Sequence, residues 1–568
     1  MTAQSTQTDR SRLHLFAAVA AIAEQLPDKP AVVGYGGKGS RYTYGELRRR
    51  VTALAASLRQ PPYDSMAEIG LLSENRPEWT ICYLAIVAAG KTVVPIDANY
   101  RASEVKAVVE HAKLEAVFCS ARCDSLLGEI GRSLRVLSLD SPGSRNDAGP
   151  HEYADTFESM SADGGSDTFE PGEFNETAVL IYTSGTTGTP KAVMLTHTNL
   201  LSNVRQAVDT LGLAESDTFL SVLPLHHTFE ATCGFLAPLT IGATIVYARS
   251  LKSKEILEDL GANNVSIMCG VPLLYEKMYQ SMRRKIASAP LPRRALFHTL
   301  YTASSVAWRA GRKAGVGLFA SLRTKAGLST IRLFVSGGAA LPPRIAEFFN
   351  LIGFTFLQGY GLTECSPVVS VNRPEDIEFG SVGPPLNDVD VRIANPDTAG
   401  IGEIIVRGPN TTPGYRDNPE ATAELLKDGW LHTGDLGHID QRGHVWITGR
   451  AKNVIVSAAG KNIYPEEIEE KLVLTPSIDE AVVFGRQNEK KHGEEVLAVL
   501  VPDFDYFAEV HGMSPEEPDE SLIETAISED VKQVNAGMAE YKRIASFDIS
   551  LTELEKTSTK KIKRFLYK

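Results

Sequence analysis

The chain has 568 residues, of which 43% are hydrophobic, so it can bury large cores over roughly three or four domain-sized units. Its net charge of −12 argues against a general nucleic-acid-binding protein, so no nucleic-acid partner is expected. The six cysteines form no CxxC pair and no Cys/His zinc pattern, which indicates reduced core thiols and a cytosolic setting.

The first predicted element is an apolar segment at residues 13–23, LHLFAAVAAIA. It resembles the apolar part of a signal peptide, but it is short, and Glu24 follows it without a cleavage-like stretch. We therefore expect an amphipathic helix packed on the domain and no transmembrane span.

Strand and helix patterns alternate between residues 31 and 138. AVVGYG, EIGLLS, KTVVPID and LEAVFCS are typical of strands, and YGELRRRVTALAASLRQ is typical of a helix. This alternation predicts a parallel α/β sheet. The polar residues 140–176 predict a linker, and a second α/β series runs over residues 177–358.

Short β segments replace this alternation between residues 389 and 449. VDVRIA, GEIIVRG and HVWITG are separated by Gly- and Pro-rich turns, which predicts a small barrel or meander. A further unit starts at Arg450, with PEEIEEKL as a helix and EAVVFG and EVLAVLVP as strands.

One segment departs from the overall charge. Residues 281–332 contain eleven Lys and Arg residues and no Asp or Glu, while the rest of the chain carries 47 basic and 70 acidic residues. Aromatic and leucine side chains are interleaved with the basic ones. The segment could lie on an anionic membrane surface, meet an acidic protein, or be a helical insertion with a solvated basic face.

The strongest local pattern is IYTSGTTGTPKAVMLTH, residues 181–197, in which a strand runs into a loop of Thr, Ser and Gly that ends at Lys191. Glycines allow close backbone approach to a polyphosphate, hydroxyl and amide groups donate to its oxygens, and lysine adds a positive charge. The spacing of Gly185, Gly188 and Lys191 does not fit a Walker P-loop.

This stretch closely resembles the signature loop of the adenylate-forming superfamily, which includes acyl-CoA synthetases. Five further motifs of that superfamily follow in its order: LPLHHTFE, SGGAALP, QGYGLTE, WLHTGDLG and GRAKNVIVSAAGKNIYPEEIE. The resemblance covers about residues 27–564, and the motifs look most like those of long-chain fatty acid–CoA ligases.

The resemblance implies the residues that bind ATP. Those for the triphosphate are Thr183, Ser184, Gly185, Thr186, Thr187, Gly188 and Lys191. Those for the adenine, ribose and α-phosphate are Gly338, Ala339, Gln358, Gly359, Tyr360, Gly361, Thr363, Asp435, Ile447 and Arg450. The cofactor Mg²⁺ is expected on Glu364 and Thr187.

The resemblance also implies the acyl, thiol and catalytic residues. The acyl group is expected against His227, Gly338, Gly361, Leu362 and Val368, and the CoA tunnel against Gly460 and Lys461. Lys452 falls at the hinge. The catalytic set is Lys561, Thr183, Lys191, His227 and Glu364.

The C-terminal residues EKTSTKKIKRFLYK would by themselves indicate a basic tail. In the superfamily, this position holds a lysine that acts on the carboxylate and α-phosphate, and Lys561 matches it. A glycine usually precedes that lysine, whereas here Lys560 does, so a register that uses Lys560 stays open. Asn453 also replaces the usual Asp just after the hinge.

The implied fold is α/β. An N-terminal domain, residues 1–449, would contain two α/β subdomains and a small β-barrel, and a smaller mobile α/β domain, residues 450–568, would carry the lysine, with the active site between them. The implied reaction activates a fatty acid with ATP and transfers it to CoA. Two alternatives are an acyl–acyl carrier protein ligase and a non-catalytic nucleotide or lipid sensor. We expect a cytoplasmic protein, or one peripheral at the inner face of the membrane.

Overall fold

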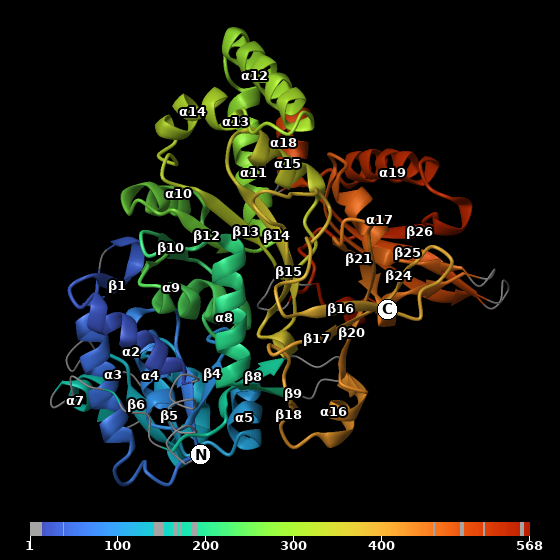
Figure 1. Cartoon of the computed structure of the whole chain (residues 1–568). Helices are drawn as coiled ribbons and strands as arrows, with labels where there is room; N and C mark the ends of the chain where they lie inside the picture. Colours follow the sequence, from blue (N-terminus) through green and yellow to red (C-terminus); the bar gives the residue numbers. More distant parts are fainter. Residues whose placement is uncertain are drawn as a thin grey trace. The chain divides into compact units, whose positions relative to one another are not determined.

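The chain folds into two compact units. Unit 1 comprises residues 1–390 and 406–431, and unit 2 comprises residues 391–405 and 432–568. The predicted division at residue 449, which concerns the domain expected to move, stays a prediction. The computed structural model (Figure 1) describes residues 14–37, 39–140, 153–162, 169, 173–183, 191–457, 461–488, 493–514, 517–556 and 562–567.

The first eight-stranded sheet of unit 1 is mostly parallel. Its antiparallel edge strands are β15 and β2, and six parallel strands lie between them. In spatial order the strands are β15 (Val368–Val371), β14 (Phe356–Gly361), β13 (Leu333–Ser336), β12 (Ile267–Gly270), β10 (Thr218–Ser221), β11 (Thr244–Tyr247), β1 (Pro30–Val33) and β2 (Arg41–Thr43).

The second eight-stranded sheet of unit 1 contains three of the four predicted strands of the N-terminal series, EIGLLS, KTVVPID and LEAVFCS, whereas the fourth, AVVGYG, forms β1 of the first sheet. β4, β3, β5 and β6 are parallel neighbours, and their inner residues are apolar and buried. In order the strands are β18 (Gly414–Tyr415), β9 (Lys191–Thr196), β8 (Thr177–Thr183), β4 (Thr92–Ile96), β3 (Glu68–Leu72), β5 (Ala116–Cys119), β6 (Arg135–Ser138) and β7 (Asp155–Thr156).

Helix α4 (Pro77–Ala88) is the most deeply buried helix of this region. All of its residues are buried, as expected for a helix that is apolar on every side. Trp79 and Tyr83 make edge contacts with Phe235, at ring-centroid distances of 5.9 and 5.2 Å. Its neighbours include α2 (Leu15–Gln25), which confirms the predicted N-terminal helix, and α3 (Tyr44–Leu58).

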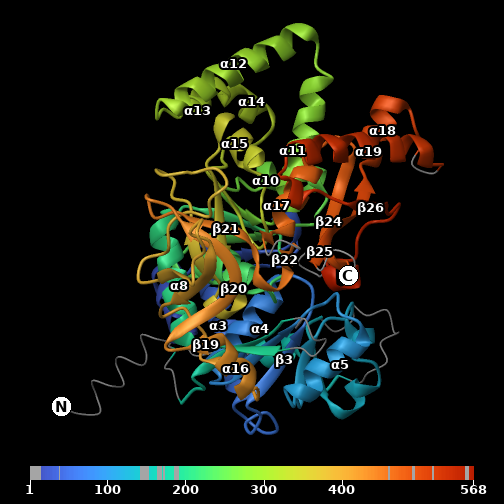
Figure 2. The same ribbon diagram turned by 90° about the vertical axis from the view of Figure 1, so that its right-hand side faces the viewer.

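A second core lies against the first sheet, where helices supply apolar side chains to strands β10, β12, β13 and β14. Figure 2 shows helices α11 to α15 gathered at one end of unit 1. Further helices of unit 1 are α5 (Ala102–His111), α6 (Asp124–Leu127), α8 (His197–Leu211), α9 (Ala237–Thr240), α10 (Ser253–Ala262), α11 (Pro272–Ala287), α12 (Leu291–Arg309), α13 (Gly315–Leu318), α14 (Ala320–Lys325), α15 (Pro343–Leu351) and α16 (Pro419–Leu425).

The predicted linker at residues 140–176 contains two elements that the sequence reading missed. Strand β7 extends the second sheet, and α7 (Phe157–Ser161) follows it directly. Thr156 caps α7 by accepting a hydrogen bond from the Ser159 backbone N–H, and Phe157 is buried. The polar sequence around it therefore concealed a helix that is held by a cap and by two buried apolar side chains, Phe157 and Met160.

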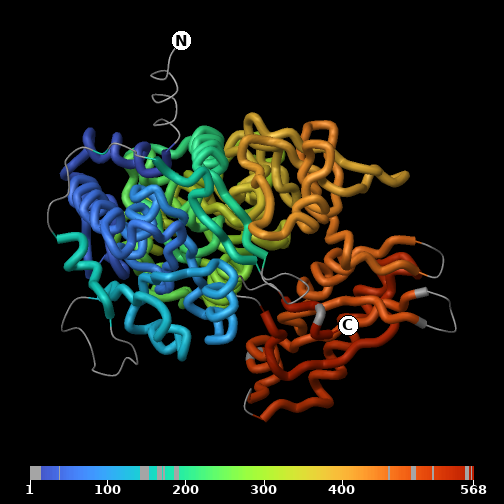
Figure 3. The backbone as a smooth tube through the Cα atoms, turned by 90° about the horizontal axis from the view of Figure 1, so that it is seen from below, coloured from blue at the N-terminus to red at the C-terminus, as the bar shows by residue number. Residues whose placement is uncertain are grey.

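Unit 2 contains its own core, and its backbone from α17 onward is drawn in deep orange to red in Figure 3. Helices α17 (Pro465–Val473) and α19 (Glu520–Ala536) pack apolar side chains on a three-stranded sheet. The strands of that sheet are β24 (Ile478–Asn488), β25 (Gly493–Pro502) and β26 (Ser546–Ile549), and the shorter elements are β22 (Ile455–Val456), β23 (Asn462–Ile463) and α18 (Phe504–His511).

The predicted β-rich region is a five-stranded sheet, and the division between the two units falls within its strands β16, β17 and β20. The antiparallel pairing of β20 with β21 aligns the residues of two predicted motifs. The strands are β16 (Asp390–Ala394), β17 (Gly402–Arg407), β19 (Leu426–Lys427), β20 (Trp430–Ile439) and β21 (Val445–Arg450).

Two expectations from composition can be compared with this fold. All six cysteines are buried and free, as expected for core thiols. Within the described parts of the chain, none of the helices has the length and apolar character needed to cross a membrane.

Candidate active site

In unit 1, three predicted motifs lie at the carboxyl ends of parallel strands in the first sheet. His227 follows β10, Gly338 follows β13, and Tyr360 lies at the end of β14. Because these strands are parallel, the three motifs emerge at one edge of the sheet, where α/β proteins commonly bind ligands. His227 and Tyr360 are half-buried, and Gly338 is exposed, so ligand atoms can reach all three.

The predicted phosphate loop joins β8 to β9. Thr183 and Lys191 are opposite each other in the antiparallel pair, and both are half-buried. Their placement closes the base of the loop. The predicted residues between them lie outside the described part of the chain: Ser184, Gly185, Thr186, Thr187 and Gly188.

Tyr415 connects two of the predicted catalytic residues. Its hydroxyl donates a hydrogen bond of 2.7 Å to Glu364 Oε1, and Lys191 Nζ lies 5.0 Å from the centre of its ring. Strand β18 places Tyr415 beside β9, opposite Val193. The sequence reading missed Tyr415, because only the pairing of β18 with β9 brings it to the loop.

Glu364 is a suitable oxygen ligand for the Mg²⁺ that the resemblance implies. Its carboxylate is half-buried, and its orientation is fixed through Oε1 by Tyr415. Mg²⁺ prefers carboxylate and phosphate oxygens, so this donor fits. The second predicted ligand, Thr187, is among the residues that the structure does not describe.

The backbone around Glu364 is packed so tightly that it requires glycine. A Cβ atom at Gly361 would lie 2.0 Å from the Pro367 carbonyl oxygen. Leu362, Thr363 and Val368 are near it in the sequence and are half-buried, and their acyl and α-phosphate roles stay predictions. Gln358 is 7% exposed, and a Cβ atom at Gly359 would lie 3.2 Å from the Ser370 carbonyl oxygen. Packing therefore fixes this end of β14, which carries residues predicted to contact adenine.

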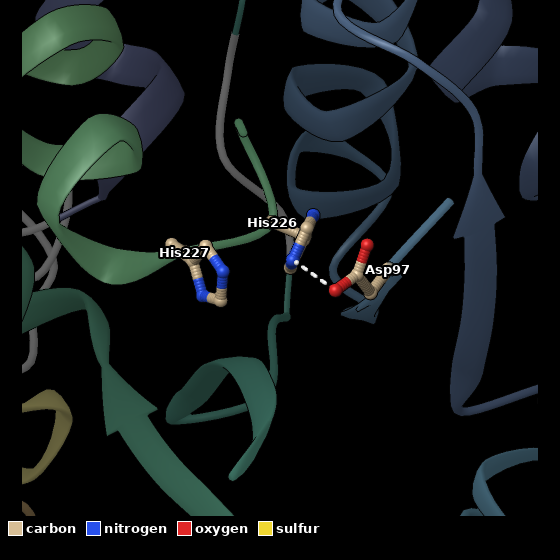
Figure 4. Close-up of side chains that lie close together, drawn as sticks. All are labelled: Asp97, His226 and His227. Atoms are coloured by element: carbon tan, nitrogen blue, oxygen red, sulfur yellow. Dashed lines mark ion pairs between the residues drawn. The ribbon is translucent and has the colours of Figure 1, made fainter. Parts of the chain in front are cut away.

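A polar group that includes a predicted residue lies beside the end of β10 (Figure 4). His226 Nε2 is 3.2 Å from Asp97 Oδ2, and the His226 and His227 rings have centroids 4.1 Å apart. Asp97 is 2% exposed and accepts hydrogen bonds through Oδ1 from the Asn99 backbone and side chain. The sequence reading named His227 but missed the other two residues, since Asp97 comes from the other sheet.

The same group could hold a metal ion, although not of the predicted kind. The ligand atoms of Asp97, His226 and His227 lie within 4.8 Å of one another, the one such group found among the described residues. Two imidazoles and a carboxylate suit zinc or iron better than Mg²⁺. The Asp97 carboxylate and the His226 ring therefore lie close together, and the His226 ring contacts the His227 ring.

Glu230, the last residue of the LPLHHTFE motif, is a buried carboxyl group. It is 1% exposed, and burial raises its pKa to about 8. Helix η3 (Glu230–Leu236) begins at this residue, and Gly234 leaves the space that the carboxyl group fills. Near neutral pH this side chain is therefore protonated.

In unit 2, the two predicted ribose ligands contact each other directly. Asp435 and Arg450 are opposite one another in β20 and β21, and Arg450 Nε is 2.6 Å from Asp435 Oδ1. Asp435 is buried, whereas Arg450 is partly exposed. Ile447, on the same strand, is 36% exposed and is available to a ligand.

The residues predicted for the hinge and the CoA tunnel lie close together in sequence, within unit 2. Lys452 is exposed in a short helical turn, and Asn453 Nδ2 donates a 2.8 Å hydrogen bond to Glu466 Oε1. Lys461 Nζ lies 4.5 Å from the centre of the Tyr541 ring. Gly460 lies outside the described residues.

The C-terminal basic residues that are described are anchored by acidic ones. Arg564 donates to Glu469 Oε2 at 2.8 Å, and Lys563 lies 3.6 Å from Glu555. Burial opposes the charge on Arg564, yet Glu469 raises its pKa above the ordinary value. Both candidate catalytic lysines, Lys560 and Lys561, lie in the part of the tail that the structure does not describe.

Family models match almost the whole chain. Residues 19–416 match the model described as AMP-binding enzyme, and residues 452–566 match the AMP-binding enzyme C-terminal domain. The first match covers the motifs from IYTSGTTGTPKAVMLTH to QGYGLTE, and the second covers the C-terminal motif from Lys452 onward; WLHTGDLG and Arg450 lie between the two matches.

Three similar proteins agree with the family matches. A long-chain-fatty-acid–CoA ligase of Mycobacterium bovis is 32% identical over 82% of this chain and 79% of its own. A feruloyl-CoA synthase of an Amycolatopsis species is 31% identical over 82% of this chain and 84% of its own. The structure of ATP-bound MatB from Rhodopseudomonas palustris has a TM-score of 0.76 and 26% identity, over 98% of both chains. The chain therefore belongs to the AMP-binding enzyme family and is an acid–CoA ligase that works through an acyl-adenylate.

Proposed function

We propose that the enzyme activates long-chain fatty acids. The acid attacks the α-phosphorus of ATP, the acyl-adenylate forms, and pyrophosphate leaves; CoA then takes the acyl group and AMP is released. The mycobacterial long-chain relative and the motif combination LPLHHTFE with GKNIYPEEIE support this choice. The feruloyl-CoA synthase relative supports the competing choice of an aromatic acid.

The contact of Lys191 and Glu364 with Tyr415 carries the proposal for the first step. A carboxylate is a weak nucleophile, so positioning and charge neutralisation must supply most of the rate enhancement. Lys191 would neutralise phosphate charge, and Tyr415 holds the Glu364 carboxylate in one orientation. Mg²⁺ bound by Glu364 and Thr187 would supply further positive charge at the triphosphate.

We assign Lys561 to the carboxylate and α-phosphate oxygens. One well-aimed donor of this kind is worth roughly 3–4 kcal/mol of barrier. Asp435 and Arg450 would bind the ribose, because a carboxylate and a guanidinium side by side offer both an acceptor and donors to its hydroxyl groups.

The second step would use a different position of the C-terminal domain, residues 450–568. Rotation at Lys452 would remove Lys561 and bring Gly460 and Lys461 to the CoA tunnel. The variant Lys452→Pro should form the acyl-adenylate normally and fail to form the thioester. Equal loss of the two half-reactions, measured separately by pyrophosphate exchange and by thioester formation, would contradict the hinge role.

The substrate proposal is tested with a panel of acids in the presence of ATP. We expect the highest kcat/KM with CoA for acids of palmitate length, and low values for ferulate and short chains. Faster transfer to an acyl carrier protein than to CoA would favour the carrier protein ligase. No ATP–pyrophosphate exchange with any acid would favour the non-catalytic sensor. We propose that the enzyme acts in the cytoplasm or peripherally at the inner face of the membrane.

A further inference from the structure

Exposed apolar side chains of unit 1 are concentrated in one helical segment. Fourteen large apolar side chains are exposed among the described residues, and six of them fall between residues 291 and 322. Large exposed apolar clusters on proteins commonly mark contact with a partner or a membrane. The six are Leu291 (70%), Leu296 (58%), Val306 (61%), Val316 (51%), Leu318 (37%) and Leu322 (47%).

Helix α12 has one side fixed to the protein and one side without such packing. Its inner side places Phe297 5.3 Å from Phe319 and Tyr301 6.1 Å from Phe348, measured between ring centroids. Ser304 Oγ donates a 2.7 Å hydrogen bond to the Leu351 carbonyl. The packed side therefore fixes the orientation of the helix, and the outer side presents Leu296 and Val306 to the surroundings.

Positive charge frames the apolar side chains. The segment contains no acidic residue, and exposed basic residues lie at both ends of α12. Figures 1 and 2 both place α12, α13 and α14 at one end of unit 1, beyond α15. The exposed basic residues near the helix ends are Arg283, Arg284, Lys285, Arg293, Arg294, Arg309, Arg312 and Lys313.

We propose that the outer surface of α12 to α14, residues 291–325, docks on an anionic lipid bilayer. Apolar side chains would enter the headgroup region while Lys and Arg meet lipid phosphates, the combination that interfacial helices use. The charge is of one sign and the apolar side chains spread over about 30 residues, which suits a broad surface better than a compact protein patch. The purpose of docking rests on the proposed function, since long-chain acids partition into membranes.

The test uses the full-length enzyme and vesicles sedimented by centrifugation. Wild type should bind vesicles of phosphatidylcholine with phosphatidylglycerol, should bind pure phosphatidylcholine far more weakly, and should dissociate as salt increases. The double variant Arg293→Gln/Arg294→Gln should bind anionic vesicles about thirtyfold more weakly, since each basic residue near the surface contributes roughly a factor of five. The matched control Arg41→Gln/Arg132→Gln loses the same charge elsewhere on unit 1 and should bind like wild type.

A second pair of variants isolates the apolar contribution. Leu296→Ser/Val306→Ser should weaken vesicle binding at least tenfold at every salt concentration. Leu251→Ser/Val510→Ser removes two side chains of similar exposure elsewhere and should have no effect. Equal binding by test and control variants, or no binding of wild type to anionic vesicles, would overturn the proposal. Loss of binding to an acidic carrier protein in the same variants, without vesicle binding by wild type, would instead identify a protein surface.

Ligase activity with a soluble short-chain acid separates docking from the proposed function. All four double variants should retain wild-type activity on that acid, because none of these residues belongs to the candidate active site. If wild type binds anionic vesicles but does not activate long-chain acids, the proposed substrate is wrong and the docking surface stands. If wild type activates long-chain acids without binding anionic vesicles, the docking surface is wrong and the proposed substrate stands.

Discussion

Two basic segments of this chain have opposite surroundings. In the C-terminal tail, Arg564 is bonded to Glu469, and the two side chains are only 16% and 17% exposed. In α12, Arg293, Arg294 and Arg309 are exposed, and no acidic residue occurs between residues 281 and 332. A run of Lys and Arg therefore has no fixed meaning, because neighbouring carboxylates decide whether the charge serves the fold or remains available to a partner.

The largest effect that we expect comes from the tail. Lys561→Ala should lower the rate of acyl-adenylate formation by about a hundredfold or more, because it removes one aimed cationic donor. ATP–pyrophosphate exchange with palmitate measures this step. Lys560→Ala is the matched control and should change the rate little. If Lys560→Ala has the larger effect, the register is shifted by one residue, and if neither matters, the tail has no catalytic role.

The next effect tests whether the rest of the tail belongs to the fold of unit 2. Arg564→Ala should lower the free energy of unfolding of unit 2 by about 3 kcal/mol, because it leaves the half-buried Glu469 carboxylate without its cation. Urea unfolding followed by circular dichroism measures this change.

The neighbouring residue supplies the control for that variant. Lys563→Ala breaks a longer and more exposed pair with Glu555, so it should cost less than about 1 kcal/mol. If the two variants lose similar amounts of unfolding free energy, burial does not determine how much an ion pair of this tail contributes to stability.

The sequence predicted which residues to compare but not their surroundings. Strand and helix patterns gave most elements correctly, since β3, β4 and α3 follow local apolar periodicity and a Thr43–Glu46 capping box. The motif order located Glu364, Asp435 and Arg450. Contacts between segments that are far apart in the chain could not be predicted from the sequence. Tyr415 contacts Glu364 only because β18 pairs with β9, and Asp97 lies beside His226 although it follows a strand of the other sheet.

Glu230 is a buried carboxyl group that forms no ion pair with the described residues, which makes it a useful contrast to Glu469. Glu469 has Arg564 beside it, whereas burial raises the pKa of Glu230 to about 8. Between its ordinary pKa and about 8, the folded protein keeps a proton that the unfolded chain has lost, so stability falls as pH rises through this range. From pH 6.5 to pH 8.5, wild type should lose about 2 kcal/mol of unfolding free energy relative to Glu230→Gln.

This comparison needs unfolding curves of both proteins at the two pH values. Contributions from other titrating groups are common to wild type and Glu230→Gln, so the difference between the two curves isolates the carboxyl group. A constant difference across this pH range would mean that Glu230 is ionised in the folded protein. Its position in the LPLHHTFE motif would then add a buried negative charge close to His227.

The smallest expected effect is the change in stability when an exposed arginine of α12 is replaced. Arg309→Gln should change the free energy of unfolding by less than about 0.5 kcal/mol, because its side chain is exposed at the end of α12 and contributes little to packing. Urea unfolding of unit 1 measures this value, with Arg332→Gln as the contrast. Arg332 bonds to the buried Asp217, so its loss should cost several times more. A large loss of unfolding free energy for Arg309→Gln would mean that the basic residues of α12, like Arg564 in the tail, stabilise the fold. The reason for assigning them to a membrane would then be removed.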